Sequence, residues 1–207
     1  MGPTGKLPLI LASASPRRQE LLRLASIPLE IIPSQAEERF LRGESAAEHV
    51  RRVARTKAMD VAEQHQGRWV LAADTVVEID GQILGKPQDR REAEEMLRSL
   101  SRREHGVLTG YCILRGPSAE KREGMVISRV KFRALTAEEI CWYINTGEPF
   151  GKAGGYAIQG KAAFMVQEVH GSYTNVVGLP LCEVVEALRE LGAVDLFLPQ
   201  RRANDGQ

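Results

Sequence analysis

Short apolar runs alternate with amphipathic stretches along the chain. The first run, residues 8–12, has the length and composition of a buried strand. A polar turn at residues 13–15 follows, and then comes Pro16, a residue favoured at the first position of a helix. The pattern predicts a strand, a tight turn and a helix that begins at Pro16, with Ser15 as its N-cap.

Longer stretches repeat apolar residues at a spacing close to 3.6, which is the period of an amphipathic helix. Residues 45–64 carry alanines and valines on one face, and Lys57 lies on that face too. Residues 89–100 form a second such helix with a solvated charged face. A capping box at residues 136–139 predicts a helix that runs to about residue 146, and a further helix is expected over residues 180–191.

Apolar and alternating segments between these helices predict the strands. The run 69–79 is apolar on both sides of Asp74, and Asp80-Gly81 after it is a hairpin turn that pairs residues 76–79 with residues 82–84. The remaining predicted strands are 29–32, 105–114, 126–132 and 163–169, of which 105–114 and 126–132 alternate as half-buried strands do and are joined by a polar turn around residues 116–118.

Length and composition favour a single α/β domain. A chain of 207 residues can bury a sizeable core, with residues 1–7 and 200–207 expected to be frayed tails. A net charge of +1 argues against a nucleic acid polymer or an acidic membrane surface as partner. Three cysteines without paired spacing argue against a disulfide framework and a zinc site. Without a secretory signal or a membrane-spanning run, the expected location is cytoplasmic.

Arg17 and Arg18 fall in the first turn of the predicted helix, where acidic residues are usual because the helix dipole is positive there. Free backbone N–H groups, the Ser13 and Ser15 hydroxyls and two guanidinium groups would together bind a phosphate or a carboxylate. The alternative is an ordinary capped helix with solvated arginines.

Asp74 is the most unusual carboxylate of the sequence, because an unpaired charge inside an apolar strand costs several kcal/mol. At a strand end facing a crevice it would hold a divalent metal or act as a general base, with Thr75 beside it as a hydroxyl donor. A turn aspartate that caps backbone N–H groups is the alternative. Lys57, among alanines and valines, needs an anionic partner unless it snorkels to solvent.

Two further segments carry candidate ligands. Lys86, between Gly85 and Pro87, is a candidate phosphate ligand. The glycine-rich segment 147–160 contains Lys152, which would meet phosphate, and Gln159, whose amide would read a nucleobase edge; a plain irregular loop is equally consistent with its composition. The adjacent Glu37 and Glu38 are typical of a solvated surface.

Several motifs in order resemble those of the Maf family of nucleoside triphosphate pyrophosphatases. They are Ser13-x-Ser15-Pro16-Arg17-Arg18, Ala73-Asp74-Thr75, Gly85-Lys86-Pro87, Lys152-Ala153-Gly154-Gly155-Tyr156-Ala157-Ile158-Gln159-Gly160 and Val177-Gly178-Leu179-Pro180. The resemblance covers about residues 9–191. It implies an inosine-triphosphatase-like fold, with a long mixed sheet and helices around two lobes and a central cleft. It also implies a metal-dependent enzyme that splits a nucleoside triphosphate into monophosphate and pyrophosphate, commonly as a homodimer.

The resemblance also implies roles for individual residues. Asp74 would be the proton acceptor that activates the attacking water, or would share that water with the metal. Glu38 would help to hold Mg²⁺ or Mn²⁺. The residues implied to bind the triphosphate are Ser13, Arg17, Lys57 and Lys86. The residues implied to select the base are Arg18, Thr75 and Gln159, and they match the branch that acts on dTTP and UTP.

Two positions depart from the family pattern. Gly151 stands where an aspartate is usual before Lys152, and Ala157 stands where glycine is usual. If that aspartate assists metal binding, activity here would be lowered, and if it only braces the loop, little changes. Gly151 leaves open a nucleotide-binding regulator of cell division with little or no hydrolysis, and the same reaction on methylated GTP is a further alternative.

Overall fold

The computed structural model describes residues 7–116 and 120–196. Within them, seven strands form one sheet in the order β2-β1-β3-β5-β6-β7, with β4 paired to β3 outside this path. The strands are β1 (Leu9–Leu11), β2 (Leu29–Ile31), β3 (Trp69–Ile79), β4 (Gln82–Leu84), β5 (Glu104–Arg115), β6 (Lys121–Phe132) and β7 (Val166–His170). The α-helices are α1 (Pro16–Leu24), α2 (Ala46–Ala62), α3 (Arg90–Leu100), α4 (Ala137–Asn145), α5 (Tyr173–Val177) and α6 (Leu181–Glu190), and the 3₁₀ helices are η1 (Ala153–Gly155) and η2 (Lys161–Met165).

The sheet is mixed. Strand β1 pairs in parallel with β2 and β3, whereas β3 with β5, β5 with β6 and β6 with β7 are antiparallel. The three long strands β3, β5 and β6 form its centre, and the hairpin at Asp80-Gly81 adds β4 as predicted. The predicted α/β class, with a mixed sheet flanked by helices, is confirmed.

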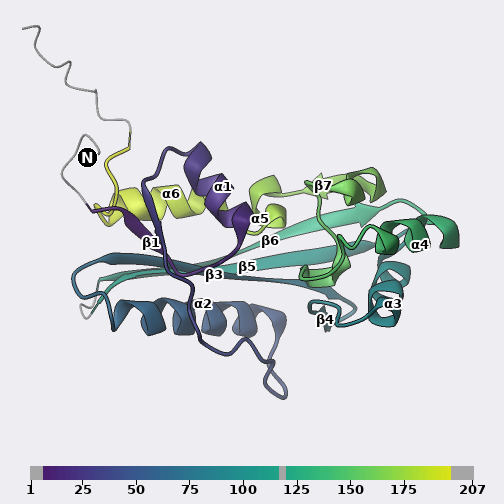
Figure 1. Ribbon diagram of the computed structural model, residues 1–207, viewed down its shortest axis with the longest axis horizontal. Coiled ribbons are helices and arrows are strands. Elements are labelled where there is room, and N and C mark those ends of the chain that lie inside the picture. The colour runs from purple at the N-terminus through teal and green to yellow at the C-terminus, as the bar shows by residue number, and fades with distance from the viewer. Residues whose placement is uncertain (1–6, 117–119, 197–207) are drawn as a thin grey trace, which may run out of the picture.

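Helices cover both faces of the sheet. In Figure 1, α2 lies on one face and α1, α5 and α6 lie on the other. Successive residues of β3 follow this division, because side chains of a strand point alternately to its two faces. Val70 and Ala72 pack with the apolar face of α2, while Leu71 and Ala73 pack with α1 and α6.

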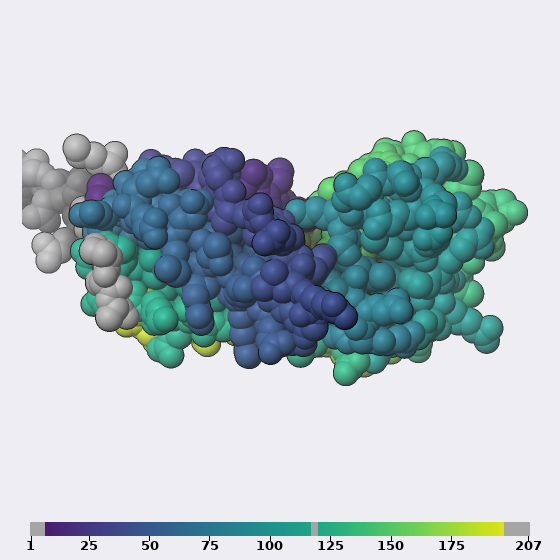
Figure 2. Space-filling view, turned by 90° about the horizontal axis from the view of Figure 1, so that it is seen from below, coloured from purple at the N-terminus to yellow at the C-terminus, as the bar shows by residue number. Residues whose placement is uncertain are grey.

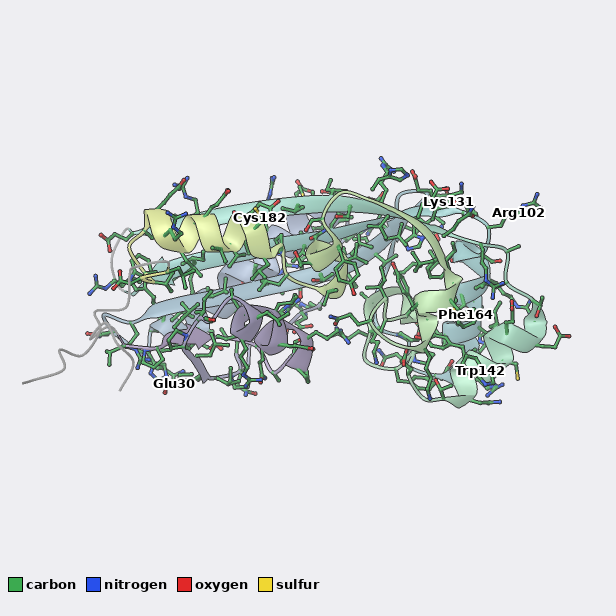
Figure 3. All side chains as sticks on the ribbon, turned by 90° about the horizontal axis from the view of Figure 1, so that it is seen from above. Glu30, Arg102, Lys131, Trp142, Phe164 and Cys182 are labelled. Carbon is green, nitrogen blue, oxygen red and sulfur yellow. The ribbon has the colours of Figure 1, made fainter. Side chains whose placement is uncertain are left out.

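A second lobe is built on the far ends of the long strands. There α3 and α4 share a core with Val77 of β3, Val107 of β5 and Phe132 of β6. Figure 3 shows Trp142 and Phe164 at this end of the molecule and Glu30 at the opposite end. Since β3 and β5 contribute to the cores of both lobes, residues from the two lobes meet across the middle of the sheet.

Most predicted elements are confirmed, and the exceptions concern β5, the start of β7 and one short helix. Strand β5 is buried on both faces rather than half-buried, because α2 covers one face and α5 and α6 cover the other. Residues 163–165 belong to η2 rather than to a strand, and the short helix α5 was not predicted. The turn residues 117–118 and the C-terminal tail lie outside the described residues.

Gly110 of β5 lets α2 approach the sheet closely. It lies opposite Asp74 in the β3–β5 register. A Cβ atom at this position would lie 2.5 Å from the carbonyl carbon of Val50 and 2.9 Å from the backbone nitrogen of Arg51, both in α2. Only glycine allows this distance, and the close contact brings the inward side chains of α2 to Asp74.

Candidate functional site

A cavity of about 550 Å³ lies between the two lobes. Figure 2 shows the molecule hollowed between the part that begins the chain and the part built from its middle. All the site residues predicted from the sequence line this cavity: Ser13, Arg17, Arg18, Glu38, Lys57, Asp74, Thr75, Lys86, Lys152 and Gln159. Gly151 lines it as well.

The turn between β1 and α1 forms one wall. Ser15 is the N-cap residue with extended backbone and Pro16 opens the helix, as predicted, but the Ser15 side chain makes no capping hydrogen bond. Instead, the Ser13 hydroxyl accepts from the Ser15 backbone N–H at 3.2 Å. With no acidic residue in its first turn, α1 directs a positive helix end and Arg17 toward the cavity.

Arg18 is almost completely buried beside this turn. Its Nε donates to the Gly178 carbonyl at 2.8 Å, Nη1 to the Ser13 hydroxyl at 3.2 Å and Nη2 to the Thr75 hydroxyl at 3.1 Å. Burial lowers the pKa of Arg18 from its ordinary value, although the nearby carboxylate of Asp74 opposes this change. Because all three donors are directed by fixed partners, the guanidinium group has one defined orientation.

Asp74 is only 6% exposed and lies in the middle of β3 rather than at a strand end or in a turn, which corrects both positions considered from the sequence. Its Oδ1 accepts from Lys57 Nζ at 3.0 Å, and its Oδ2 lies 3.5 Å from Nε2 of His49. Both partners project from α2. These two basic groups explain how an apolar strand can contain a carboxylate.

Lys57 does not snorkel to solvent. It is 6% exposed, and its Nζ also lies 2.6 Å from Glu38 Oε1, while Lys86 Nζ lies 2.9 Å from Glu38 Oε2. Burial by itself raises the pKa of Glu38, but hydrogen bonds and positive charge from the two lysines outweigh it and lower that pKa to about 2. Glu38 is therefore ionised between two lysines and is not simply a solvated surface residue.

Lys152 and Gln159 reach the cavity from the second lobe. The Lys152 ammonium donates to the Glu148 carbonyl at 2.6 Å, and burial, together with the charge of Arg17, lowers the pKa of Lys152. Gln159 is exposed at the rim. Gly151 has φ of +75°; a Cβ there would meet no atom within 4 Å, but any residue other than glycine would be strained in this left-handed backbone conformation.

Sequence reasoning missed His49 and its partner Glu44. His49 is 1% exposed, and its Nδ1 lies 3.1 Å from Glu44 Oε2. The hydrogen bond from Arg52 is the main cause that lowers the pKa of Glu44 to about 2. The available signal was spacing, because His49 precedes Lys57 by two helical turns and so shares its face.

A divalent cation would find a small donor set here. Among the described residues, no group of three or more His, Cys, Asp and Glu side chains is arranged to hold a metal ion. Mg²⁺ is commonly held by one or two carboxylates together with substrate phosphates. Glu38 and Asp74, both in contact with Lys57 Nζ, fit that kind of site.

In the part of the chain that the structure describes, no helix has the length and apolarity needed to span a bilayer.

Comparisons with known proteins agree with the sequence motifs. A relative from Syntrophotalea carbinolica named "dTTP/UTP pyrophosphatase" is 51% identical over 195 residues, which cover 93% of this chain and 89% of the relative. A relative of the same name from Geotalea uraniireducens is 51% identical over 191 residues, covering 90% and 96%. The solved structure of the Staphylococcus aureus Ham1 protein aligns with 61% of this chain and 72% of its own, at 15% identity and a TM-score of 0.44. The sequence model described as "Maf-like protein" matches residues 8–191, and the chain therefore belongs to the Maf family.

Proposed function

We propose that this protein is a nucleoside triphosphate pyrophosphatase that hydrolyses dTTP and UTP to the monophosphate and pyrophosphate. The observation that supports this most directly is that one cavity is lined by five side chains suited to bind phosphate, two carboxylates and three side chains suited to contact a nucleobase. Relatives that are about half identical to the chain carry the name of this activity. The names of these relatives favour dTTP and UTP over methylated GTP as substrates.

The triphosphate would bind to positive groups from both lobes. Arg17 and the N-terminus of α1 approach from one side, Lys57 and Lys86 from the middle, and Lys152 from the other side. Negative charge builds on phosphate oxygens and on the leaving pyrophosphate during cleavage, and fixed cationic groups stabilise it without forming a covalent bond. The Ser13 hydroxyl, held beside Arg18, adds a neutral polar contact.

Asp74 is the proposed proton acceptor. The oxygen of a water molecule attacks the α-phosphorus, the bond from that phosphorus to the bridging oxygen breaks, and the water proton passes to the Asp74 carboxylate. Lys57 and His49 orient that carboxylate from α2. Mg²⁺ or Mn²⁺, held by Glu38 and Asp74, would supply electrophilic stabilisation of the phosphate oxygens.

Base selection is assigned to Arg18, Thr75 and Gln159. Arg18 and Thr75 are hydrogen-bonded to each other, whereas Gln159 lines the same cavity from its exposed rim. Uracil and thymine present two carbonyl oxygens and one N–H group, which suit guanidinium, amide and hydroxyl partners. The homodimer and the cytoplasmic location remain predictions.

Release of pyrophosphate by the purified protein tests the proposal. The assay compares dTTP, UTP, CTP, GTP and methylated GTP with Mg²⁺, with Mn²⁺ and with chelator. Asp74→Asn should lower kcat by at least about 100-fold while nucleotide affinity survives. Glu78→Gln is the matched control, because Glu78 lies on the same strand outside the cavity lining.

Two results would contradict the proposal. Binding of nucleotides without cleavage of any triphosphate would favour the regulatory function, and Gly151→Asp would then show whether the missing aspartate is the cause. Preferred cleavage of methylated GTP would retain the reaction and overturn the assigned substrate.

A further inference from the structure

A buried polar chain lies behind the base-binding side of the cavity. Thr75 of β3 and Thr109 of β5 are direct partners in the sheet register, and their hydroxyl oxygens are 2.9 Å apart. The Thr109 hydroxyl donates to the backbone carbonyl of Asn175 at 3.2 Å. Thr109 and Asn175 are fully buried, so both belong to the protein interior rather than to the cavity.

Asn175 holds that carbonyl in place. Its side-chain nitrogen donates to the Val107 carbonyl and to the Ser128 hydroxyl, each at 3.0 Å. Its backbone N–H donates to the Ser172 hydroxyl that caps α5. The acceptor of the Thr109 hydroxyl hydrogen is therefore fixed by the packing of α5 on β5 and β6.

This fixed acceptor sets the direction of the next hydrogen bond. A hydroxyl group has one hydrogen and two lone pairs. Two directions are possible: Thr109 donates to Asn175 and Thr75 to Thr109, over 3.2 and 2.9 Å, or Thr109 donates to Thr75 and Thr75 to the Gly178 carbonyl, over 2.9 and 3.4 Å. The first set of distances is the shorter, which favours a Thr75 hydrogen that points to Thr109. Arg18 Nη2 donates to one Thr75 lone pair at 3.1 Å. The Thr75 oxygen then keeps one lone pair for a ligand and no hydrogen.

We propose that Thr109 is a specificity-determining positioning residue, which fixes the Thr75 hydroxyl as a hydrogen-bond acceptor and so selects bases with a ring N–H over cytosine. Uracil and thymine carry a hydrogen on N3, whereas N3 of cytosine is itself an acceptor. Two acceptors cannot form a hydrogen bond, and a buried polar group without a partner is costly. The inference rests on the proposed function, in which Thr75 contacts the base.

Binding of UMP and CMP in the presence of chelator tests this inference without turnover. Isothermal titration should show that the wild-type protein prefers UMP. Thr109→Val keeps the side-chain shape but removes the acceptor, so the Thr75 hydrogen is free to point into the cavity, because the Gly178 carbonyl at 3.4 Å is a weaker acceptor than the Thr109 oxygen at 2.9 Å. The preference for UMP should fall about five- to tenfold. Thr109→Ser keeps the hydroxyl and should restore the wild-type preference.

Three results would overturn the inference. The first is an equal loss of UMP and CMP affinity in Thr109→Val, which a purely structural role would give. The second is an unchanged preference for UMP in that variant, and the third is the absence of a preference for UMP in the wild-type protein. Preference for UMP without pyrophosphate release would instead refute the proposed function alone. If Thr109→Val does not fold, N3-methyl-UMP on the wild-type protein should bind about tenfold more weakly than UMP, and equal binding would refute the acceptor role.

Discussion

Lys57 and Lys86 both contact the carboxylate of Glu38, and Lys57 also contacts the buried carboxylate of Asp74. Removing each lysine should therefore change the free energy of unfolding by very different amounts. The side chain of Lys57 is 7% exposed and that of Asp74 is 9% exposed, whereas Lys86 is 54% exposed. Lys57→Met retains most of the aliphatic stem but leaves Asp74 with His49 as its remaining basic contact. Removing one member of a buried pair costs about 3–5 kcal/mol, because the other charge stays buried.

Access of water through the cavity and the nearby His49 both reduce this penalty. We therefore expect Lys57→Met to lower the free energy of unfolding by about 3 kcal/mol, at the lower end of that range. Lys86→Met removes a largely exposed contact and should cost less than about 1 kcal/mol. In the double variant Lys57→Met/Asp74→Asn both charges are absent, so its cost should fall below the sum of the single costs by about 1–3 kcal/mol.

Urea unfolding at pH 7, followed by circular dichroism, measures the wild type, the three single variants Lys57→Met, Lys86→Met and Asp74→Asn, and the double variant. The midpoint should shift while the slope m stays constant, which shows that the surface exposed on unfolding is unchanged. Equal costs for Lys57→Met and Lys86→Met would refute the reasoning, because burial would then not determine the effect. Additive costs in the double variant would show that Lys57 and Asp74 are not coupled.

Two further predictions concern the sheet. Burial lowers the pKa of His105 to about 4, so the unfolded chain takes up a proton first as the pH falls below about 6.5, and up to about 3 kcal/mol of stability should be lost between pH 6.5 and 4. Urea unfolding at several pH values should show a smaller loss of stability for His105→Gln than for the wild type. The exposed control His170→Gln should lose as much stability as the wild type. Gly110→Ala should push α2 away from the sheet, lower the free energy of unfolding by about 1–3 kcal/mol and slow pyrophosphate release about 100-fold. Gly106→Ala is the control on the same strand, because a Cβ there would have ordinary contacts, and it should keep the wild-type activity.

The sequence predicted well those features that depend on neighbouring residues. The β1–α1 turn is an example, because Ser15, Pro16 and the two arginines specify a helix start without acidic residues. The burial of Asp74 between apolar neighbours was also visible from its surroundings in the chain. Even so, its position within β3 was predicted wrongly, since a carboxylate inside a strand is tolerated only when basic groups from another element reach it.

The missing partners lie far away in the chain, and local patterns do not report them. A polar residue on an apolar helix face is part of a site only if the strand packed against that face places a polar or charged side chain opposite it. For α2 that strand is β3, and Gly110 of β5 sets how closely the helix approaches. The spacing between His49 and Lys57 shows that they share a face, but it does not show that both face Asp74. The apolar surroundings of Asp74 and Lys57 marked both residues and the resemblance to a family implied their roles, while the role of His49 became apparent only from its 3.5 Å distance to the Asp74 carboxylate.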